Sequence, residues 1–114
     1  MFKTVIDEVA MVEMPKCEKA YIQVITKNDP DFIVRKITLK NGGFMPNHTN
    51  LISHQQVVLS GEAMVFIGDE KIHAKSGDFL YIPAGVAHKY EAIYGVDYEF
   101  LCMICTKPDK IEMV

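Results

Sequence analysis

Residues 55–85, QQVVLSGEAMVFIGDEKIHAKSGDFLYIPAG, decide the fold of this chain. They contain four short strand-like runs, and turn-forming residues follow each run: Ser60-Gly61, Gly68-Asp69, Ser76-Gly77 and Pro83-Ala84. Short β-rich runs separated by Gly, Ser, Asp or Pro are typical of antiparallel strands. Because Gly68-Asp69 tolerates positive φ, residues 67–71 are predicted to form a tight hairpin.

The same pattern extends through the rest of the chain. Further strand-like runs cover residues 20–26, 32–39, 88–94 and 96–106, and turn signals such as Asn41-Gly42-Gly43 separate them. About eight short strands at this spacing predict an all-β sandwich or barrel. Residues 7–19 are ambiguous, and Pro15 disfavours a long helix there.

Length and composition narrow the class of protein further. The 114 residues suit a single domain over residues 1–114, and 49% hydrophobic with 24% charged residues are close to globular averages. The net charge of −3 is scattered without a basic stripe, so we expect no nucleic-acid partner. No apolar run approaches the roughly 20 residues that cross a bilayer, so we expect no membrane partner.

The cysteines indicate a reducing environment. The chain has three, and Cys102 and Cys105 form a CxxC sequence inside an apolar strand-like run. Side chains three positions apart on a strand face opposite sides, so this pair is poorly placed for a disulfide or a zinc site. We therefore expect a reduced, cytoplasmic protein.

Three of the four histidines, His48, His54 and His88, lie beside turn signals. On a straight strand His48 and His54 would be roughly 20 Å apart, whereas one metal ion needs its donors at about 2 Å. Residues 51–53 must therefore bend if the two are to share an ion. Most histidines are surface or hydrogen-bonded core residues, so spacing alone leaves a metal site open.

Two motifs make the chain resemble the cupin superfamily. Residues 77–92 match the second cupin motif, G-x5-P-x-G-x2-H-x3-N, except for Ala92 at the terminal asparagine. Residues 42–61 match the first motif, G-x5-H-x-H-x(3,4)-E-x6-G, in part: His48 takes the first histidine position, Asn50 replaces the second, and His54 replaces the glutamate. The resemblance implies a double-stranded β-helix, or jelly-roll barrel.

The departures from the first motif resemble a subgroup of small cupins that hold manganese with four histidines. By that resemblance the ligands are His48, His54 and His88, and Asn50 either ligates weakly or only forms hydrogen bonds. The implied cofactor is a divalent transition metal, Mn, Fe, Ni, Zn or Cu, with Mn preferred. Neutral imidazoles leave the metal charge uncancelled, which favours an anionic substrate.

Other side chains are expected beside these ligands. Parity along the strands places Gln56 with His54 and Tyr90 with His88, so both are candidate catalytic or hydrogen-bonding groups. Arg35 lies on an otherwise apolar face, where it binds substrate, pairs with an internal carboxylate or sits at the barrel mouth. The resemblance also points Phe100 and Cys102 inward toward substrate, although a buried cysteine is commonly just a small core residue.

The resemblance leaves several functions open. One is a metal-dependent enzyme acting on a small molecule, with dioxygenase-like, isomerase or decarboxylase chemistry. A second is a non-catalytic cupin that binds a small ligand, and the degraded first motif favours it. A third, the sensory half of a regulator, lacks a DNA-binding segment. We expect a homodimer, because an exposed sheet edge invites pairing and similar proteins commonly dimerise.

Overall fold

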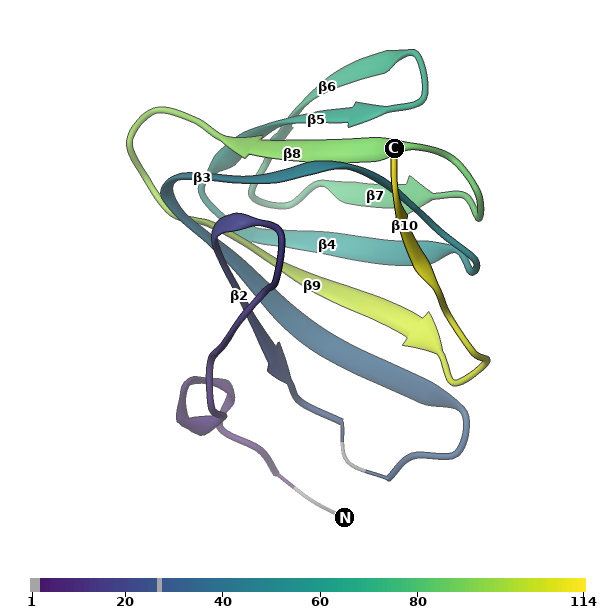
Figure 1. Cartoon of the computed structure of the whole chain (residues 1–114). Coiled ribbons are helices and arrows are strands. Elements are labelled where there is room, and N and C mark those ends of the chain that lie inside the picture. Colours follow the sequence, from purple (N-terminus) through teal and green to yellow (C-terminus); the bar gives the residue numbers. More distant parts are fainter. Residues whose placement is uncertain (1–2, 27) are drawn as a thin grey trace.

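The computed structural model describes residues 3–26 and 28–114, whose regular secondary structure is β-strand apart from one short 3-10 turn. In chain order, the elements are the 3-10 turn η1 (Ile6–Glu8) and the strands β1 (Val12–Glu13), β2 (Glu18–Val24), β3 (Phe32–Asn50), β4 (His54–Ser60), β5 (Glu62–Ile67), β6 (Glu70–Lys75), β7 (Phe79–Ile82), β8 (His88–Ala92), β9 (Tyr98–Cys105) and β10 (Ile111–Met113). The strands curl into a jelly-roll barrel, as the sequence predicts (Figure 1). No helix in the described part of the chain is long and apolar enough to cross a membrane.

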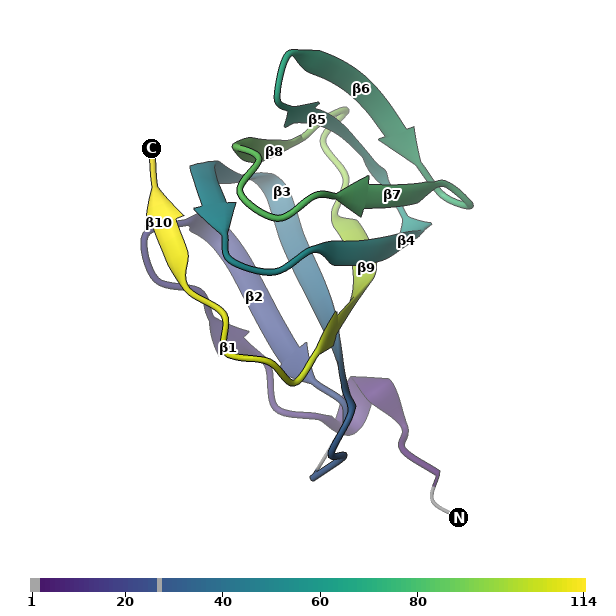
Figure 2. The same ribbon diagram turned by 90° about the vertical axis from the view of Figure 1, so that its right-hand side faces the viewer.

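All strand pairs are antiparallel, and β3 connects the two halves of the barrel. The order along the sheet is β6-β5-β8-β3-β9-β4-β7. Residues 32–39 of β3 pair with β9, and residues 44–50 pair with β8 and β10. Strand β2 pairs with residues 35–39 and also, through Glu18, with Phe44. Figure 2 shows the C-terminal strand β10 running beside β3.

The structure corrects one turn prediction. The sequence predicts that Asn41-Gly42-Gly43 ends a strand, but β3 continues through these residues to Asn50. Gly42 has a φ of 77°, and the pairing of β2 with β3 changes register between Glu18 and Ala20. The glycines therefore bend one long strand, which lets it pair with different neighbours on either side of the bend.

Other local predictions are confirmed. Ile67 pairs with Glu70 across a turn at Gly68-Asp69, which is the predicted hairpin. Cys102 is buried while Cys105 is partly exposed, as expected for side chains on opposite faces of one strand. The barrel core is filled by apolar side chains from the inner faces, among them the fully buried Leu39, Val65 and Phe100.

A substitution at Gly61 would test how tightly the connection between β4 and β5 is packed. Its φ is 77°, and a Cβ there would lie 1.9 Å from the backbone oxygen of Asp97. We expect Gly61→Ala to lower the free energy of unfolding by more than about 3 kcal/mol, because backbone strain and a backbone clash add. Gly77→Ala is the control, since its φ is 93° but no atom lies within 4 Å; it should cost only about 1–2 kcal/mol. Equal losses in urea unfolding would contradict this account.

Candidate metal centre

The three motif histidines line one small cavity of about 30 Å³ inside the barrel. Residues 51–53 form the bend between β3 and β4 that the sequence requires, so His54 returns toward His48. The cavity is lined by Met14, Arg35, Ile37, Met45, His48, Asn50, His54, Gln56, His88, Tyr90, Phe100 and Ile111. It has room for one or two water-sized groups.

His48 and His88 form a pair across strands β3 and β8. They are register partners after an irregularity between Met45 and His48, and their ring centroids are 4.2 Å apart. Each Nδ1–H donates to a backbone carbonyl two residues earlier, at 2.8 Å for Pro46 and 2.9 Å for Val86. This bond fixes the tautomer and leaves the lone pair on Nε2, which is how ligating histidines are commonly held.

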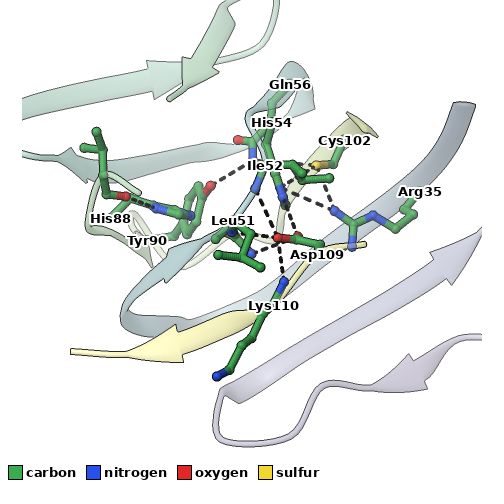
Figure 3. Close-up of polar contacts among 12 residues, drawn as sticks. Arg35, Leu51, Ile52, His54, Gln56, His88, Tyr90, Cys102, Asp109 and Lys110 are labelled. Atoms are coloured by element: carbon green, nitrogen blue, oxygen red, sulfur yellow. Dashed lines mark hydrogen bonds and ion pairs between the residues drawn. The ribbon is translucent and has the colours of Figure 1, made fainter. Parts of the chain in front are cut away.

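His54 has a different environment. Its Nε2 lies 3.1 Å from Oδ2 of Asp109, and its Nδ1 lies 3.5 Å from Nη2 of Arg35 (Figure 3). A guanidinium only donates and a carboxylate only accepts, so the tautomer with the proton on Nε2 satisfies both contacts. The sulfur of Cys102 also lies 3.4 Å from Nδ1. In this state His54 presents no lone pair to the cavity.

Asp109 is the residue that sequence reasoning missed. It lies in the loop between β9 and β10, 55 positions after His54, and no motif or spacing connects the two. Its Oδ1 accepts hydrogen bonds from the backbone amides of Leu51 and Ile52, and its Oδ2 accepts one from Nδ2 of Asn50. The carboxylate thus joins the C-terminal segment to the bend that carries His54.

The donor set of the cavity fits a divalent ion in its chemistry. His48 and His88 present Nε2 lone pairs, and the buried Oδ1 of Asn50 has no hydrogen-bond partner among the described residues. A cation would satisfy that oxygen, and an amide oxygen suits manganese. As the side chains stand, however, no group of three His, Cys, Asp or Glu residues within 3–26 and 28–114 is disposed to hold a metal ion. His54, engaged by Asp109, is set apart from the other pair.

Gln56 and Tyr90 form a buried hydrogen bond beside the histidines. Nε2 of Gln56 donates to the Tyr90 hydroxyl at 2.8 Å, while Oε1 of Gln56 has no partner among the described residues. Burial raises the pKa of Tyr90 above its ordinary value, so the phenol keeps its proton. Tyr90 can therefore act as a donor but not as a phenolate base.

Arg35, Phe100 and Cys102 also lie at the site. Nη2 of Arg35 donates to the sulfur of Cys102 at 3.1 Å, and the structure records no carboxylate ion pair for Arg35 within the described residues. Phe100 lines the cavity and stacks on Tyr90 at 5.4 Å. Cys102 is fully buried between Arg35 and His54. The thiol rather than an internal acid is thus the partner of the arginine.

Burial determines the charge state of the site. It lowers the pKa of His88 to about 4 and lowers the pKa of His54 as well, although the hydrogen bond to Asp109 opposes the second shift. For Asp109, burial favours the neutral acid, but hydrogen bonds from His54 and from the amides of Ile52 and Leu51 outweigh it and lower the pKa. The lowered pKa values favour the neutral imidazoles of His54 and His88 and the carboxylate of Asp109, which lies beside His54.

The geometry defines a barrel with an internal cluster of histidines, and comparison with known proteins places it in a family. A model of the cupin domain family, Cupin_2, matches residues 36–104. This segment is more than half of the chain, and the chain belongs to the cupin family.

Solved structures share the fold at low sequence identity. The polyketide cyclase RemF from Streptomyces resistomycificus superposes with a TM-score of 0.90 at 19% identity, covering 100% of this chain and 85% of that one. A cupin-2 domain, Rru_A2000 from Rhodospirillum rubrum, superposes with a TM-score of 0.86 at 19% identity, covering 99% and 80%. These similarities concern the fold.

One sequence relative matches a shorter segment. The uncharacterized protein MJ1618 of Methanocaldococcus jannaschii is 37% identical over 51 residues, which are 45% of this chain and 39% of that protein. The match thus spans well under half of that relative's length.

The lowered pKa of His88 predicts a pH dependence of stability in the metal-free protein. Between pH 6.5 and 4 the unfolded chain binds a proton that the folded chain does not, so stability falls as the pH falls. We expect a loss of about 3 kcal/mol by pH 4 from this group. Urea unfolding in the presence of a chelator gives the free energy of unfolding at each pH. This free energy should fall less steeply with decreasing pH for His88→Gln than for the wild type. A free energy of unfolding that falls with pH as steeply for His88→Gln as for the wild type would contradict this assignment.

Proposed function

We propose that this cupin binds a divalent transition metal, with manganese preferred, and acts on a small anionic molecule. The observation that carries the proposal is the His48–His88 pair, whose rings lie 4.2 Å apart with Nδ1 engaged and Nε2 available. Buried histidines that only fill space need no such matching Nδ1 hydrogen bonds to the backbone. The unpartnered Oδ1 of Asn50 in the same cavity gives further support.

The residues around the cavity suit a reaction on an anion. When bound, the metal would supply Lewis-acid chemistry for isomerisation or decarboxylation, or redox chemistry for dioxygenase-like oxidation. Arg35 provides a fixed positive charge for a carboxylate or enolate. Tyr90, kept as a phenol and bonded to Gln56, holds a proton at its hydroxyl oxygen.

A neighbouring apolar cavity supports binding of a substrate body larger than the metal cavity admits. This cavity has a volume of about 210 Å³ and shares Met14, Met45, His48 and Ile111 with the small cavity. Lys16 also contributes to its lining. We propose that the reacting group of the substrate enters the small cavity while its apolar part occupies the larger one.

A non-catalytic ligand-binding cupin is the second candidate, and one observation favours it. Nε2–H of His54 donates a hydrogen bond to Asp109, so this nitrogen presents no lone pair to the cavity. No three His, Cys, Asp or Glu side chains among the described residues are disposed to hold an ion as they stand. In that function the two cavities hold a small molecule through Arg35 and the apolar walls. The fold does not choose between the two, because one fold hosts many functions, although the similarity to a polyketide cyclase is compatible with an enzyme.

We propose further that the protein is a homodimer of the reducing cytoplasm. The support is three free thiols and exposed apolar side chains on one face of the sheet, where Tyr81 on β7 and Met103 on β9 flank Gln55 on β4. Phe79 and Tyr81 are 58% and 52% exposed. Exposed apolar patches of this kind mark interfaces.

Metal content tests the first candidate. After reconstitution with Mn²⁺ and desalting, elemental analysis of the wild type should find close to one equivalent. His88→Ala should lose most of the metal, because it removes an Nε2 donor, whereas His73→Ala on the exposed strand β6 should retain it. Less than about one tenth of an equivalent of any transition metal in the wild type would favour the ligand-binding cupin.

Solution mass tests the dimer. Light scattering should give twice the 12.9 kDa chain mass for the wild type. Tyr81→Glu should give the monomer mass, because a carboxylate in the apolar face would be buried without a partner. Glu70→Gln on β6, at the opposite end of the sheet order, should remain dimeric. A monomeric wild type at micromolar concentration would overturn the proposal.

A further inference from the structure

The carboxylate of Asp109 is held more firmly than a surface loop residue requires. Oδ1 accepts from the backbone amides of Leu51 at 2.8 Å, Lys110 at 2.9 Å and Ile52 at 3.3 Å. Oδ2 lies 3.1 Å from Nε2 of His54 (Figure 3) and 3.2 Å from Nδ2 of Asn50. One oxygen is thus anchored to the backbone, and the other is presented to residues that line the metal cavity.

Pairing of β10 with β3 delivers this carboxylate to the cavity. Ile111 pairs with Asn50 and Met113 pairs with His48, so the segment that begins at Asp109 follows the strand that carries two of the motif positions. The side chain of Asp109 is only 18% exposed. Asp109 also lies beyond residues 36–104, which the family model matches, so it is a feature of this chain outside the matched segment.

The first motif of this chain contains no carboxylate, since His54 stands at its acidic position and Asn50 at a histidine position. Asn50 has a shorter side chain than histidine, and its Nδ2 donates to Asp109. The carboxylate therefore contacts both altered positions. Among three neutral imidazoles it would also supply the one negative charge that partly cancels a divalent ion.

The spacing of the donors agrees with shared ligation. Two adjacent ligands on an octahedral ion, each about 2.1–2.2 Å from it, are about 3.0 Å apart. Nε2 of His54 and Oδ2 of Asp109 are 3.1 Å apart. With the His54 proton on Nδ1, where the sulfur of Cys102 lies 3.4 Å away, Nε2 would become a lone-pair donor beside Oδ2. Nη2 of Arg35, which lies 3.5 Å from Nδ1, would then turn away from His54.

We propose, on the basis of the metal function proposed above, that Asp109 is a metal ligand of this site. It joins His48, His54 and His88, while Nδ2 of Asn50 orients it. Because no three of these side chains are disposed to hold an ion as the described residues stand, His54 and Asp109 would turn toward the His48–His88 pair when the ion binds. The site thus has three imidazoles and one carboxylate, and the carboxylate comes from the C-terminal segment. Since carboxylate oxygen suits manganese better than late transition metals, Asp109 favours Mn²⁺ over what the three imidazoles alone would select.

The test is calorimetric titration of the metal-free full chain with Mn²⁺ and, separately, with Zn²⁺. Asp109→Asn keeps the size of the side chain and an oxygen for the backbone amides. It should weaken Mn²⁺ binding by at least about tenfold and Zn²⁺ binding less, so that the ratio of Mn²⁺ to Zn²⁺ affinity falls at least about threefold. Glu112→Gln removes the same charge from the same segment at an exposed position and should change neither affinity by more than about twofold.

The outcomes separate this inference from the proposed function. A wild type that binds neither metal overturns both. Wild-type binding with Asp109→Asn equal to Glu112→Gln overturns the role of Asp109 alone. Equal weakening of Mn²⁺ and Zn²⁺ overturns ligation and makes Asp109 a residue that positions His54. Should Asp109→Asn unfold without metal, the absorption spectrum of Co²⁺-loaded Asp109→Glu, which keeps the charge and moves the carboxylate, should differ from wild type; an identical spectrum contradicts ligation.

Discussion

The site depends on the pairing of one long strand with four neighbours. β3 runs from Phe32 to Asn50; it pairs with β9 before its glycine bend, with β8 and β10 after it, and with β2 on both sides. Arg35 lies on the first half, and His48 and Asn50 lie on the second. Because backbone hydrogen bonds fix both halves, these side chains meet in one cavity without large movement of the backbone. The irregularity between Met45 and His48 then sets which face His48 takes.

Most of the fold was predictable from the pattern of strand-forming and turn-forming residues. Alternation and turn signals predict the hairpin at Gly68-Asp69, and the second motif predicts the place of His88 at the start of β8. The prediction of a strand end at Gly42-Gly43 was wrong because glycine is found both at the ends of strands and at bends within them. Pairing with neighbouring strands decides which of the two occurs. Local sequence contains no information on those neighbours.

The candidate site was predictable where its residues share a strand or a motif. Parity places Gln56 beside His54 and Tyr90 beside His88, and all four line the cavity. The partners of these residues were not predictable in the same way. Asp109 reaches His54 across 55 positions, and Arg35 reaches Cys102 across 67. Such contacts follow from sheet register and chain path, so no periodicity along the sequence reports them.

The C-terminal segment is held mainly by polar contacts. All three residues of β10 are exposed, and β10 pairs only with β3 among the described strands. An exposed strand with a single partner gains little from apolar burial, so the hydrogen bonds of Asp109 contribute a large share of what fixes it. Ile111 lines both cavities, and Met113 lines the larger one. The carboxylate that contacts His54 therefore also anchors the short, exposed segment that forms part of the wall of the adjacent apolar cavity.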